Sequence, residues 1–359
     1  MRALLIVNPH ATSTTGPRRD VIVRALSSAV DLEVVQTRYR GDATRLAASA
    51  AADKFGLLMT LGGDGTVNEA VNGLMTGGQD SAVSQQHGQA IADRPDPPTA
   101  TADELPALAA LPGGNANVFT RSLRLPDDPI DAVAKIIEDL ANGRERRIGL
   151  GMANGRYFTF NAGLGLDAEV VRAVEGRRAH GQVVTPALYT MTALRQYYRV
   201  TDRRHPAITI CTPADLSTEP VYQCIVSNSA PWTYLGRKPV NTNPDAGFDT
   251  GLDLFALRSL STPATLWVLR QMLSDRRVPP SGGGVVTGHD LAEIVLEAGR
   301  PVAFQVDGEY MGEAENVRFR AVPDALRVVG LSELAPPAPD PLRLSPRSPE
   351  IANSENVLI

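Results

Sequence analysis

The chain is poor in cysteine and has no long apolar run. Only Cys211 and Cys224 occur among its 359 residues, so a disulfide framework is excluded and a reducing cytosol fits the composition. No window approaches the roughly 18 uninterrupted apolar residues of a spanning helix, and the apolar start ends at Asn8-Pro9, too early for a signal peptide. We therefore expect a cytoplasmic protein whose contact with any membrane is peripheral.

Positive charge is not in excess either. The 35 Lys and Arg against 40 Asp and Glu give a formal net charge of −5, which argues against a nucleic-acid partner bound through a global basic field. The five histidines show no metal-ligand spacing, so no zinc site is expected. With 43% apolar and 21% charged residues the composition is that of an ordinary globular protein, and 359 residues predict two domains.

Alternating strands and helices are expected through the first part of the chain. Strands at 3–7, 32–36, 55–61 and 108–111 alternate with helices at 20–30 and 44–52, and a further helix covers 130–140. This βαβαβ order predicts a parallel sheet whose loops gather at the carboxyl ends of its strands. We assign residues 1–140 to an α/β domain with a flexible surface insertion at 76–104.

From residue 147 the pattern changes to short strands. They are expected at 148–152, 157–161, 207–211, 221–226, 252–256, 294–297 and 303–306, with helical patterns at 186–198 and 263–273. We assign residues 141–316 to a β-rich second domain, a sandwich. Residues 317–334 are expected to pack back onto the first domain, and the proline-rich tail at 335–359 is expected to be disordered.

A glycine-rich turn carries the strongest sign of chemistry. The sequence LGGDGTVNE at 61–69 follows an apolar strand and opens a helical pattern. A strand running through Gly62, Gly63, Asp64 and Gly65 into a helix exposes backbone N–H groups at the helix N-terminus, which suits a phosphate. Asp64 is then placed to hold a cation against the phosphates or to take a proton. An ordinary glycine-rich turn is the alternative, and the complete string favours phosphate binding.

Three further segments of this kind end predicted strands. Asn8-Pro9 follows the first strand, PGGNAN at 112–117 follows the fourth, and Asp307-Gly308-Glu309 ends a strand late in the chain. Neither a Walker A sequence nor GxGxxG occurs, so backbone amides and Asn or Thr side chains would hold a phosphate in place of a P-loop lysine. Taken alone, the segment at 307–309 is more typical of a hairpin turn, and the other motifs beside it favour a functional role.

In these motifs the chain resembles the diacylglycerol/sphingosine lipid kinase family in its bacterial soluble form. The matching segments are Asn8-Pro9, GGDGTVNE at 62–69, PGGNAN at 112–117, NAGLGLDAE at 161–169 and DGE at 307–309. The resemblance implies an α/β domain like that of NAD kinases and phosphofructokinases, a lipid-binding β-sandwich, and an ATP cleft between them. It implies transfer of the γ-phosphate of ATP, with Mg²⁺, to a lipid hydroxyl, most simply diacylglycerol to give phosphatidic acid.

The resemblance also implies roles for residues at the matching positions. ATP would lie across Asn8, Gly62, Gly63, Gly65, Thr66, Glu69, Gly113, Gly114 and Asn115. Asp64 would lie near the phosphates and Mg²⁺, and Asp307 and Glu309 would enter the same cleft from the second domain. Asp307 is the candidate general base for the acceptor hydroxyl and Asp64 is the alternative, an assignment that the sequence leaves open. Glu309 would contact the nucleotide or its metal.

Two further segments are implied to bind the acceptor and a structural metal. Asp167 and Glu169 lie where relatives contact the lipid head group. The loop at 245–253 matches imperfectly a loop that holds a structural Mg²⁺ in relatives, with Asp249 as its candidate ligand. Thr250 stands where the family commonly has Asp, and Val118 is a second such departure.

A lipid acceptor implies peripheral contact with the inner face of a membrane. The segments 266–273 and 189–204 mix apolar and basic residues as an interfacial helix does, although helices packed on a sheet are the commoner explanation. A homodimer is left open. The alternatives are a kinase for a sphingoid base, ceramide or another glycerolipid, an NAD kinase, and a lipid- or nucleotide-binding regulator without turnover.

Overall fold

The computed structural model describes residues 1–11, 16–77, 101–179, 186–200, 202, 204–212 and 219–330. Most of the expected insertion at 76–104 and the whole expected tail at 335–359 lie outside these residues. Within them, no helix is long and apolar enough to cross a membrane.

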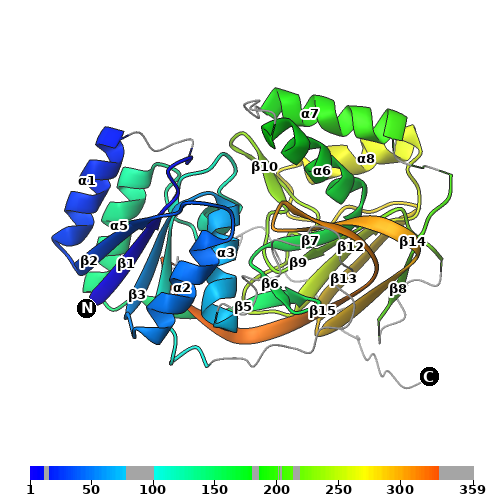
Figure 1. Cartoon of the computed structure of the whole chain (residues 1–359). Helices are drawn as coiled ribbons and strands as arrows, with labels where there is room; N and C mark the ends of the chain where they lie inside the picture. The colour runs from blue at the N-terminus through cyan, green and yellow to red at the C-terminus, as the bar shows by residue number, and fades with distance from the viewer. Residues whose placement is uncertain are drawn as a thin grey trace, which may run out of the picture.

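The first part of the chain forms a parallel sheet covered by helices. Strands β1 (Arg2–Val7), β2 (Asp31–Gln36), β3 (Leu57–Gly62) and β4 (Ala107–Pro112) lie in the order β4-β3-β1-β2, with every pairing parallel. Helices α1 (Gly16–Ser27) and α5 (Pro129–Ala141) lie on one side, and α2 (Asp42–Ala52) and α3 (Asp64–Thr76) on the other (Figure 1). Because both faces are covered, β3 and β4 are buried throughout and are apolar except for Thr60 of β3. The predicted parallel sheet is confirmed.

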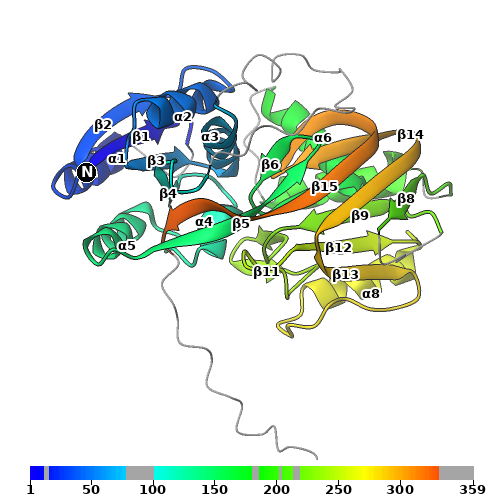
Figure 2. The same cartoon turned by 90° about the horizontal axis from the view of Figure 1, so that it is seen from below.

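The rest of the chain is β-rich and continues the same sheet. The long strand β15 (Glu309–Val329) pairs with β14 (Glu293–Val306) and β5 (Glu145–Ala153), and its Val328 pairs in parallel with Leu108 of β4. The strand order is β13-β12-β9-β7-β14-β15-β4-β3-β1-β2, so parallel and antiparallel parts form one mixed sheet. Figure 2 shows β15 and β5 running from the β-rich region to the helix-covered strands.

The remaining strands enclose a second core. They are β6 (Arg156–Phe158), β7 (Asn161–Gly165), β8 (Ile208–Cys211), β9 (Gln223–Ser227), β12 (Leu252–Leu257), β13 (Val285–Leu291) and the hairpin β10 (Thr233–Leu235) with β11 (Lys238–Val240). Phe158, Phe304 and Phe319 meet edge to face inside this core, with ring centroids 6.3 and 6.4 Å apart for the two pairs that include Phe319. The end of β15, at Leu326 and Val328, packs instead in the core of the parallel part of the sheet.

The helices of the β-rich region differ in part from the prediction. Helices α7 (Pro186–Arg195) with a π-helical turn (Gln196–Val200) and α8 (Thr262–Met272) occupy the predicted positions. Helix α6 (Leu166–Ala179) was not predicted, although Asp167 and Glu169 in its first turn are the acidic residues that favour a helix N-terminus. The predicted strands at 294–297 and 303–306 are one strand, β14, which continues through the exposed residues Gly299, Arg300 and Pro301 between them.

Candidate active site

Two glycine loops lie directly against each other at the carboxyl edge of the parallel sheet. The loop after β3 opens α3, and the loop after β4 opens the short helix α4 (Val118–Ser122). The amide of Gly113 donates to the carbonyl of Gly62 over 2.8 Å. A Cβ on Gly113 would lie 2.8 Å from Cα of Gly62, and one on Gly114 would lie 2.7 Å from Cα of Gly63. Glycine is therefore required at 113 and 114 because two backbones meet there.

The N-terminus of α3 is open to an anion. Gly63 is its N-cap and supplies no side chain to accept from the helix amides. Helix geometry leaves the amides of Asp64 and Gly65 without an intrahelical acceptor, and the helix dipole adds positive potential at this end. Asn8, which follows β1, donates through Nδ2 to Oγ1 of Thr66 over 3.2 Å. Three strand ends thus meet around a helix N-terminus that suits a phosphate.

Asp64 stands between the two glycine loops. Its Oδ1 accepts from the amide of Phe119 over 3.0 Å, so Asp64 supplies the cap that α4 lacks from its own sequence. Burial raises the pKa of Asp64 to about 6, with a contribution from Asp307, while the amides of Phe119 and Val118 act in the opposite direction. A carboxyl with such a pKa is ionised at neutral pH and is still basic enough to take a proton.

The carboxylate of Asp307, in contrast to that of Asp64, is fully hydrogen-bonded within the protein. Asp307 is 3% exposed, has a positive φ of 46°, and lies in the tight turn between β14 and β15. Its Oδ2 accepts from Asn68 Nδ2 (2.8 Å) and from the amide and hydroxyl of Thr159 (2.7 and 2.9 Å). Its Oδ1 accepts from the amides of Phe160 (3.0 Å) and Asn161 (3.2 Å). These five donors occupy the lone pairs that a general base would offer to a substrate.

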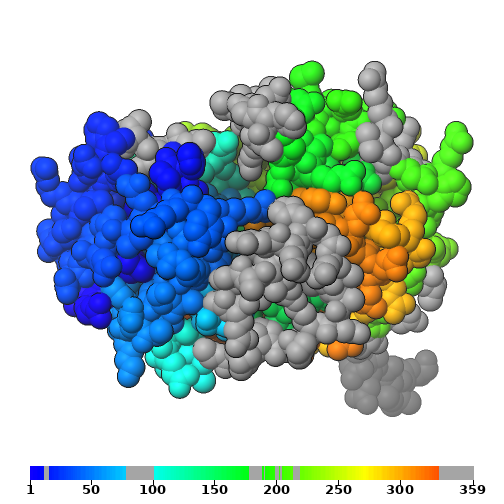
Figure 3. Space-filling view, viewed as in Figure 1, coloured from blue at the N-terminus to red at the C-terminus, as the bar shows by residue number. Residues whose placement is uncertain are grey.

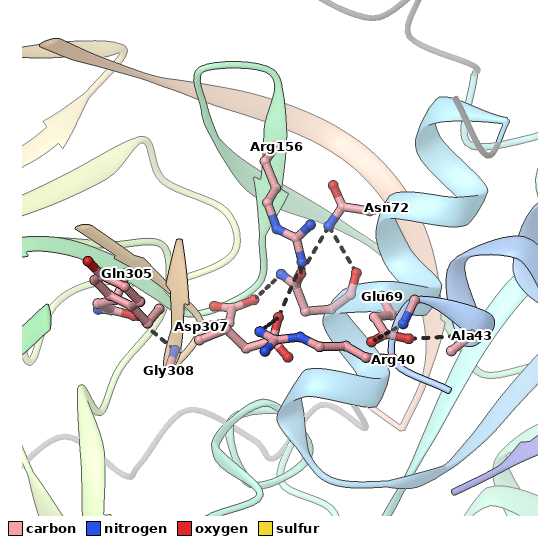
Figure 4. A network of polar contacts seen from close by, with 12 residues as sticks. Arg40, Ala43, Glu69, Asn72, Arg156, Gln305, Asp307 and Gly308 are labelled. Atoms are coloured by element: carbon pink, nitrogen blue, oxygen red, sulfur yellow. Dashed lines mark hydrogen bonds and ion pairs between the residues drawn. The ribbon is translucent and has the colours of Figure 1, made fainter. Parts of the chain in front are cut away.

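Asn68 connects α3 to the β-rich region. It is fully buried, and its Nδ2 donates to the carbonyl of Tyr157 (3.0 Å) as well as to Asp307. Its Oδ1 accepts from Arg156 over 2.6 Å, and Asn72, one turn further along α3, donates to the same carbonyl of Tyr157 over 3.0 Å. Figure 4 shows this polar network between α3, the turn before β15 and Arg156 of β6.

Glu309 is held by two arginines. Its Oε2 lies 3.4 Å from Arg156 and 3.7 Å from Arg40, which follows β2. Arg40 also faces Glu175 of α6 over 3.8 Å, and these carboxylates, Glu309 first, raise the pKa of the half-exposed Arg40 guanidinium. A Cβ on Gly65 would lie 2.7 Å from Oε1 of Glu309. Glu309 therefore does reach the glycine loop from the second region of the chain.

Glu69, which the resemblance places on ATP, binds the protein itself. Its two carboxylate oxygens accept from the amides of Gly41 (2.8 Å) and Ala43 (3.2 Å) at the start of α2. Glu69 thus caps α2 from α3, and the packing of these helices is so close that a Cβ on Gly73 would lie 2.2 Å from the carbonyl of Thr44. Exposed Asn115 lies in the loop between Gly114 and α4.

Asp167 is the second carboxyl that burial perturbs. It is 6% exposed and accepts from Gln305 Nε2 over 2.8 Å. Gln305 also donates to Asn161 Oδ1 (2.9 Å) and accepts from the amide of Gly308 (2.9 Å). Hydrogen bonds through Gln305 therefore connect Asp167 to the turn that carries Asp307. Burial raises the pKa of Asp167 to about 6, opposed by the bond from Gln305.

Replacing Asp167 with asparagine should stabilise the protein at neutral pH. The pKa of Asp167 rises from 3.8 in the unfolded chain to about 6 in the folded protein. Its contribution to stability is therefore complete below pH 3.8 and is lost as the pH rises through 6. Asp167→Asn should then exceed the wild type by up to about 3 kcal/mol at pH 7.5, and the difference should shrink towards pH 4.5. Urea unfolding across this range measures it, with exposed Asp31→Asn as control. A difference that does not change with pH would contradict the assignment.

Glu169 faces different surroundings from Asp167. It lines a polar cavity of about 100 Å³ together with Arg172 and Arg300. The structure therefore does not bring the two predicted head-group residues to one point, although both lie in the first turn of α6.

The loop at 245–253 does not gather its aspartates around a metal position. Asp249 pairs with Arg146 of β5, and Asp253 is buried against His289 Nδ1, 2.8 Å away. In the described residues, no group of three or more His, Cys, Asp and Glu side chains is placed to hold a metal ion. The candidate ligand Asp249 is paired with an arginine, and its role in a structural Mg²⁺ site stays a prediction. A Mg²⁺ bound beside the phosphates of ATP needs only one or two carboxylates, and Asp64 could supply one of them.

Sequence reasoning missed the residues that join the two parts of the site. Asn68 stands inside the GGDGTVNE motif, and a polar residue on the buried face of a helix is a signal that could have identified it. Arg40 and Arg156 belong to no motif. Their roles follow from ion pairs with Glu309, which is 153 residues from Arg156 in the sequence.

Comparison with known proteins finds relatives for the first part of the chain. The sequence profile of the diacylglycerol kinase catalytic domain matches residues 2–153, which include both glycine loops and Asp64. This segment is therefore similar to diacylglycerol kinase catalytic domains. The diacylglycerol kinase of Staphylococcus saprophyticus is 31% identical over 159 residues, and that of Bacillus subtilis is 30% identical over 178 residues.

The fold of the described residues is also found in solved structures. A Bacillus anthracis protein superimposes with a TM-score of 0.68 at 22% identity, covering 92% of this chain and 97% of that protein. A diacylglycerol kinase from the same organism gives a TM-score of 0.61 at 19% identity. These two likenesses concern the fold. The two curated relatives are matched over 43% and 50% of their length, so the chain spans about half of them.

Proposed function

We propose that the chain is an ATP- and Mg²⁺-dependent lipid kinase. It transfers the γ-phosphate of ATP to a lipid hydroxyl, with diacylglycerol as the default acceptor and phosphatidic acid as the product. The observation that carries the proposal is the open N-terminus of α3, where two glycine loops abut beside Asp64. This site lies inside the segment that matches the profile of the diacylglycerol kinase catalytic domain.

The phosphates of ATP would be held by backbone amides and small polar side chains. The proposed contacts come from the three loops at the sheet edge: Asn8, Gly62, Gly63, Gly65, Thr66, Gly113, Gly114 and Asn115. Phosphoryl transfer asks mainly for positioning and neutralisation of charge, which a helix N-terminus provides. Mg²⁺, held by Asp64 and the phosphates, would neutralise the charge that develops on the transferred group.

Asp64, rather than Asp307, is proposed to serve the acceptor hydroxyl. The five donors to Asp307 leave it no lone pair for a proton, whereas a pKa of about 6 suits Asp64 to this task. Asp307 would be a positioning residue that fixes the β14–β15 turn. That turn presents Glu309 to Gly65, so Asp307 would act on the nucleotide loop through Glu309.

The acceptor would approach from the β-rich region at the inner face of a membrane. Asp167 is proposed to contact the acceptor head group, because its buried carboxyl is joined through Gln305 to the turn that carries Asp307. Glu169, beside the polar cavity, is a second proposed contact.

An acceptor panel tests this function. The purified protein is incubated with γ-labelled ATP and Mg²⁺ in separate tubes that contain micellar diacylglycerol, a sphingoid base, ceramide, another glycerolipid, or NAD without lipid. The proposal predicts label in a lipid and most strongly in diacylglycerol. Label in NAD alone would instead make the chain an NAD kinase.

A further inference from the structure

Large apolar side chains are exposed on two helices of the β-rich region. On α7 and the π-helical turn after it, Met191, Leu194 and Tyr198 are 68, 52 and 51% exposed. They are spaced i, i+3 and i+7, so they share one face. On α8, Leu266 and Trp267 are 59 and 55% exposed. We call these five residues the docking face.

The two helices are joined on their inner sides. The hydroxyl of Tyr197 donates to the carbonyl of Leu260 (2.8 Å) just before α8 and lies 3.2 Å from Oγ1 of Thr265 within it. Tyr197 also shares a buried core with Val268 and Met272 of α8. Figure 1 shows both helices at the same edge of the β-rich region, and Figure 3 shows α7 at the outer surface there. The buried sides hold the helices together and leave the docking face outward.

The charge around the docking face is basic, in a chain whose formal net charge is −5. No Asp or Glu occurs at 186–200 or at 259–274. Exposed basic residues flank both helices, and Lys238 at the tip of the β10–β11 hairpin pairs with Asp275, the first acidic residue after α8, over 3.8 Å. The other exposed basic residues are Arg195, Arg237, Arg270, Arg276 and Arg277. Apolar side chains within a basic border are typical of a surface that binds anionic lipid.

We propose that the docking face binds an anionic lipid bilayer. The inference deepens the proposed function, because a membrane acceptor requires a surface that meets the membrane. Gln196, between α7 and Tyr198, donates through Nε2 to the carbonyl of Glu169 over 3.2 Å. A bilayer on the docking face would therefore lie beside the first turn of α6, which carries Asp167.

Vesicle co-sedimentation tests the docking face. Wild-type protein should bind phosphatidylcholine vesicles that contain phosphatidylglycerol. Binding to pure phosphatidylcholine vesicles, or to either kind of vesicle at high salt, should be weaker. The double variant Leu266→Ser/Trp267→Ser should bind the anionic vesicles at least about tenfold less, since it removes two inserted apolar side chains. The matched control Val21→Ser/Val34→Ser changes exposed apolar residues on α1 and β2 and should bind as the wild type does.

Fluorescence of the wild type provides a second readout that needs no variant. Trp267 is 55% exposed, so its emission should shift to shorter wavelength when anionic vesicles are added. No shift and no vesicle binding would overturn the proposal, as would equal loss in the two double variants. Concentration-dependent dimers that Leu266→Ser/Trp267→Ser abolishes, without vesicle binding by the wild type, would show that a second copy covers this face.

A short-chain, water-soluble diacylglycerol separates this proposal from the function itself. The docking-face variant should phosphorylate it at the wild-type rate and fail only with vesicles. Vesicle binding without phosphorylation of any lipid would contradict the kinase proposal and support the docking face. Phosphorylation of the soluble lipid without vesicle binding would support the kinase proposal and contradict the docking face.

Discussion

Replacing Asp307 with alanine should lower the free energy of unfolding by about 5 kcal/mol or more. The carboxylate accepts five hydrogen bonds while 3% exposed, so the substitution leaves several buried donors unsatisfied, each at a cost of about 1–3 kcal/mol. Since domains are typically stable by only about 5–15 kcal/mol, most of the margin would be lost. Urea unfolding and Tm measure the effect.

Asp307→Asn is the informative companion variant. It keeps one acceptor oxygen but turns an NH₂ group towards donors, so its stability should fall between that of Asp307→Ala and the wild type. An Asp307→Ala protein that folds with wild-type stability and loses only phosphoryl transfer would contradict the anchoring role. It would restore Asp307 as the general base, the role that the resemblance to lipid kinases first suggested.

Replacing Asp64 with asparagine should preserve the stability of the protein and remove most of its kinase activity. The asparagine side chain has the same size and would still accept from the amide of Phe119, so the fold should be kept. Loss of the carboxylate removes both a proton acceptor and a Mg²⁺ ligand, so kcat should fall by about 10³-fold. The Tm without ATP should stay near the wild-type value or exceed it at neutral pH, because a charge that burial penalises is removed.

Steady-state kinetics on the acceptor that the panel identifies measure this loss. The control is Asp31→Asn, on the exposed edge of β2, which should leave kcat unchanged. An Asp64→Asn enzyme that retains more than about a tenth of the wild-type kcat would exclude Asp64 from the reacting centre.

Local patterns in the sequence predicted the scaffold of the site. Strands β3 and β4 are buried and mostly apolar, and glycine stands at the end of β3 (Gly62) and directly after β4 (Gly113). Parallel order brings these ends together, so the two glycine loops could be expected to meet. The strand, turn and helix at 57–76 were predictable for the same reason, because each signal lies within a few residues of the structure it specifies.

The partners of the carboxylates could not be predicted in this way. Asn68 and Asp307 are 239 residues apart, and nothing near either residue in the sequence specifies the other. Glu69 looks like a nucleotide contact from its place in the motif, and only the position of α2 shows that it caps a neighbouring helix. Arg156 is one arginine among many until the fold sets it between Asn68 and Glu309.

Transfer of label from ATP distinguishes a lipid kinase from a protein that only binds the nucleotide. The purified protein is given ATP labelled either at the γ- or at the α-phosphate, with Mg²⁺ and micellar diacylglycerol, beside Asp64→Asn. We expect γ-label to appear in the lipid, α-label not to appear there, and the variant to transfer γ-label about 10³-fold more slowly. If neither label reaches any lipid while ATP still raises the Tm, the chain is a nucleotide-binding regulator and the account is wrong.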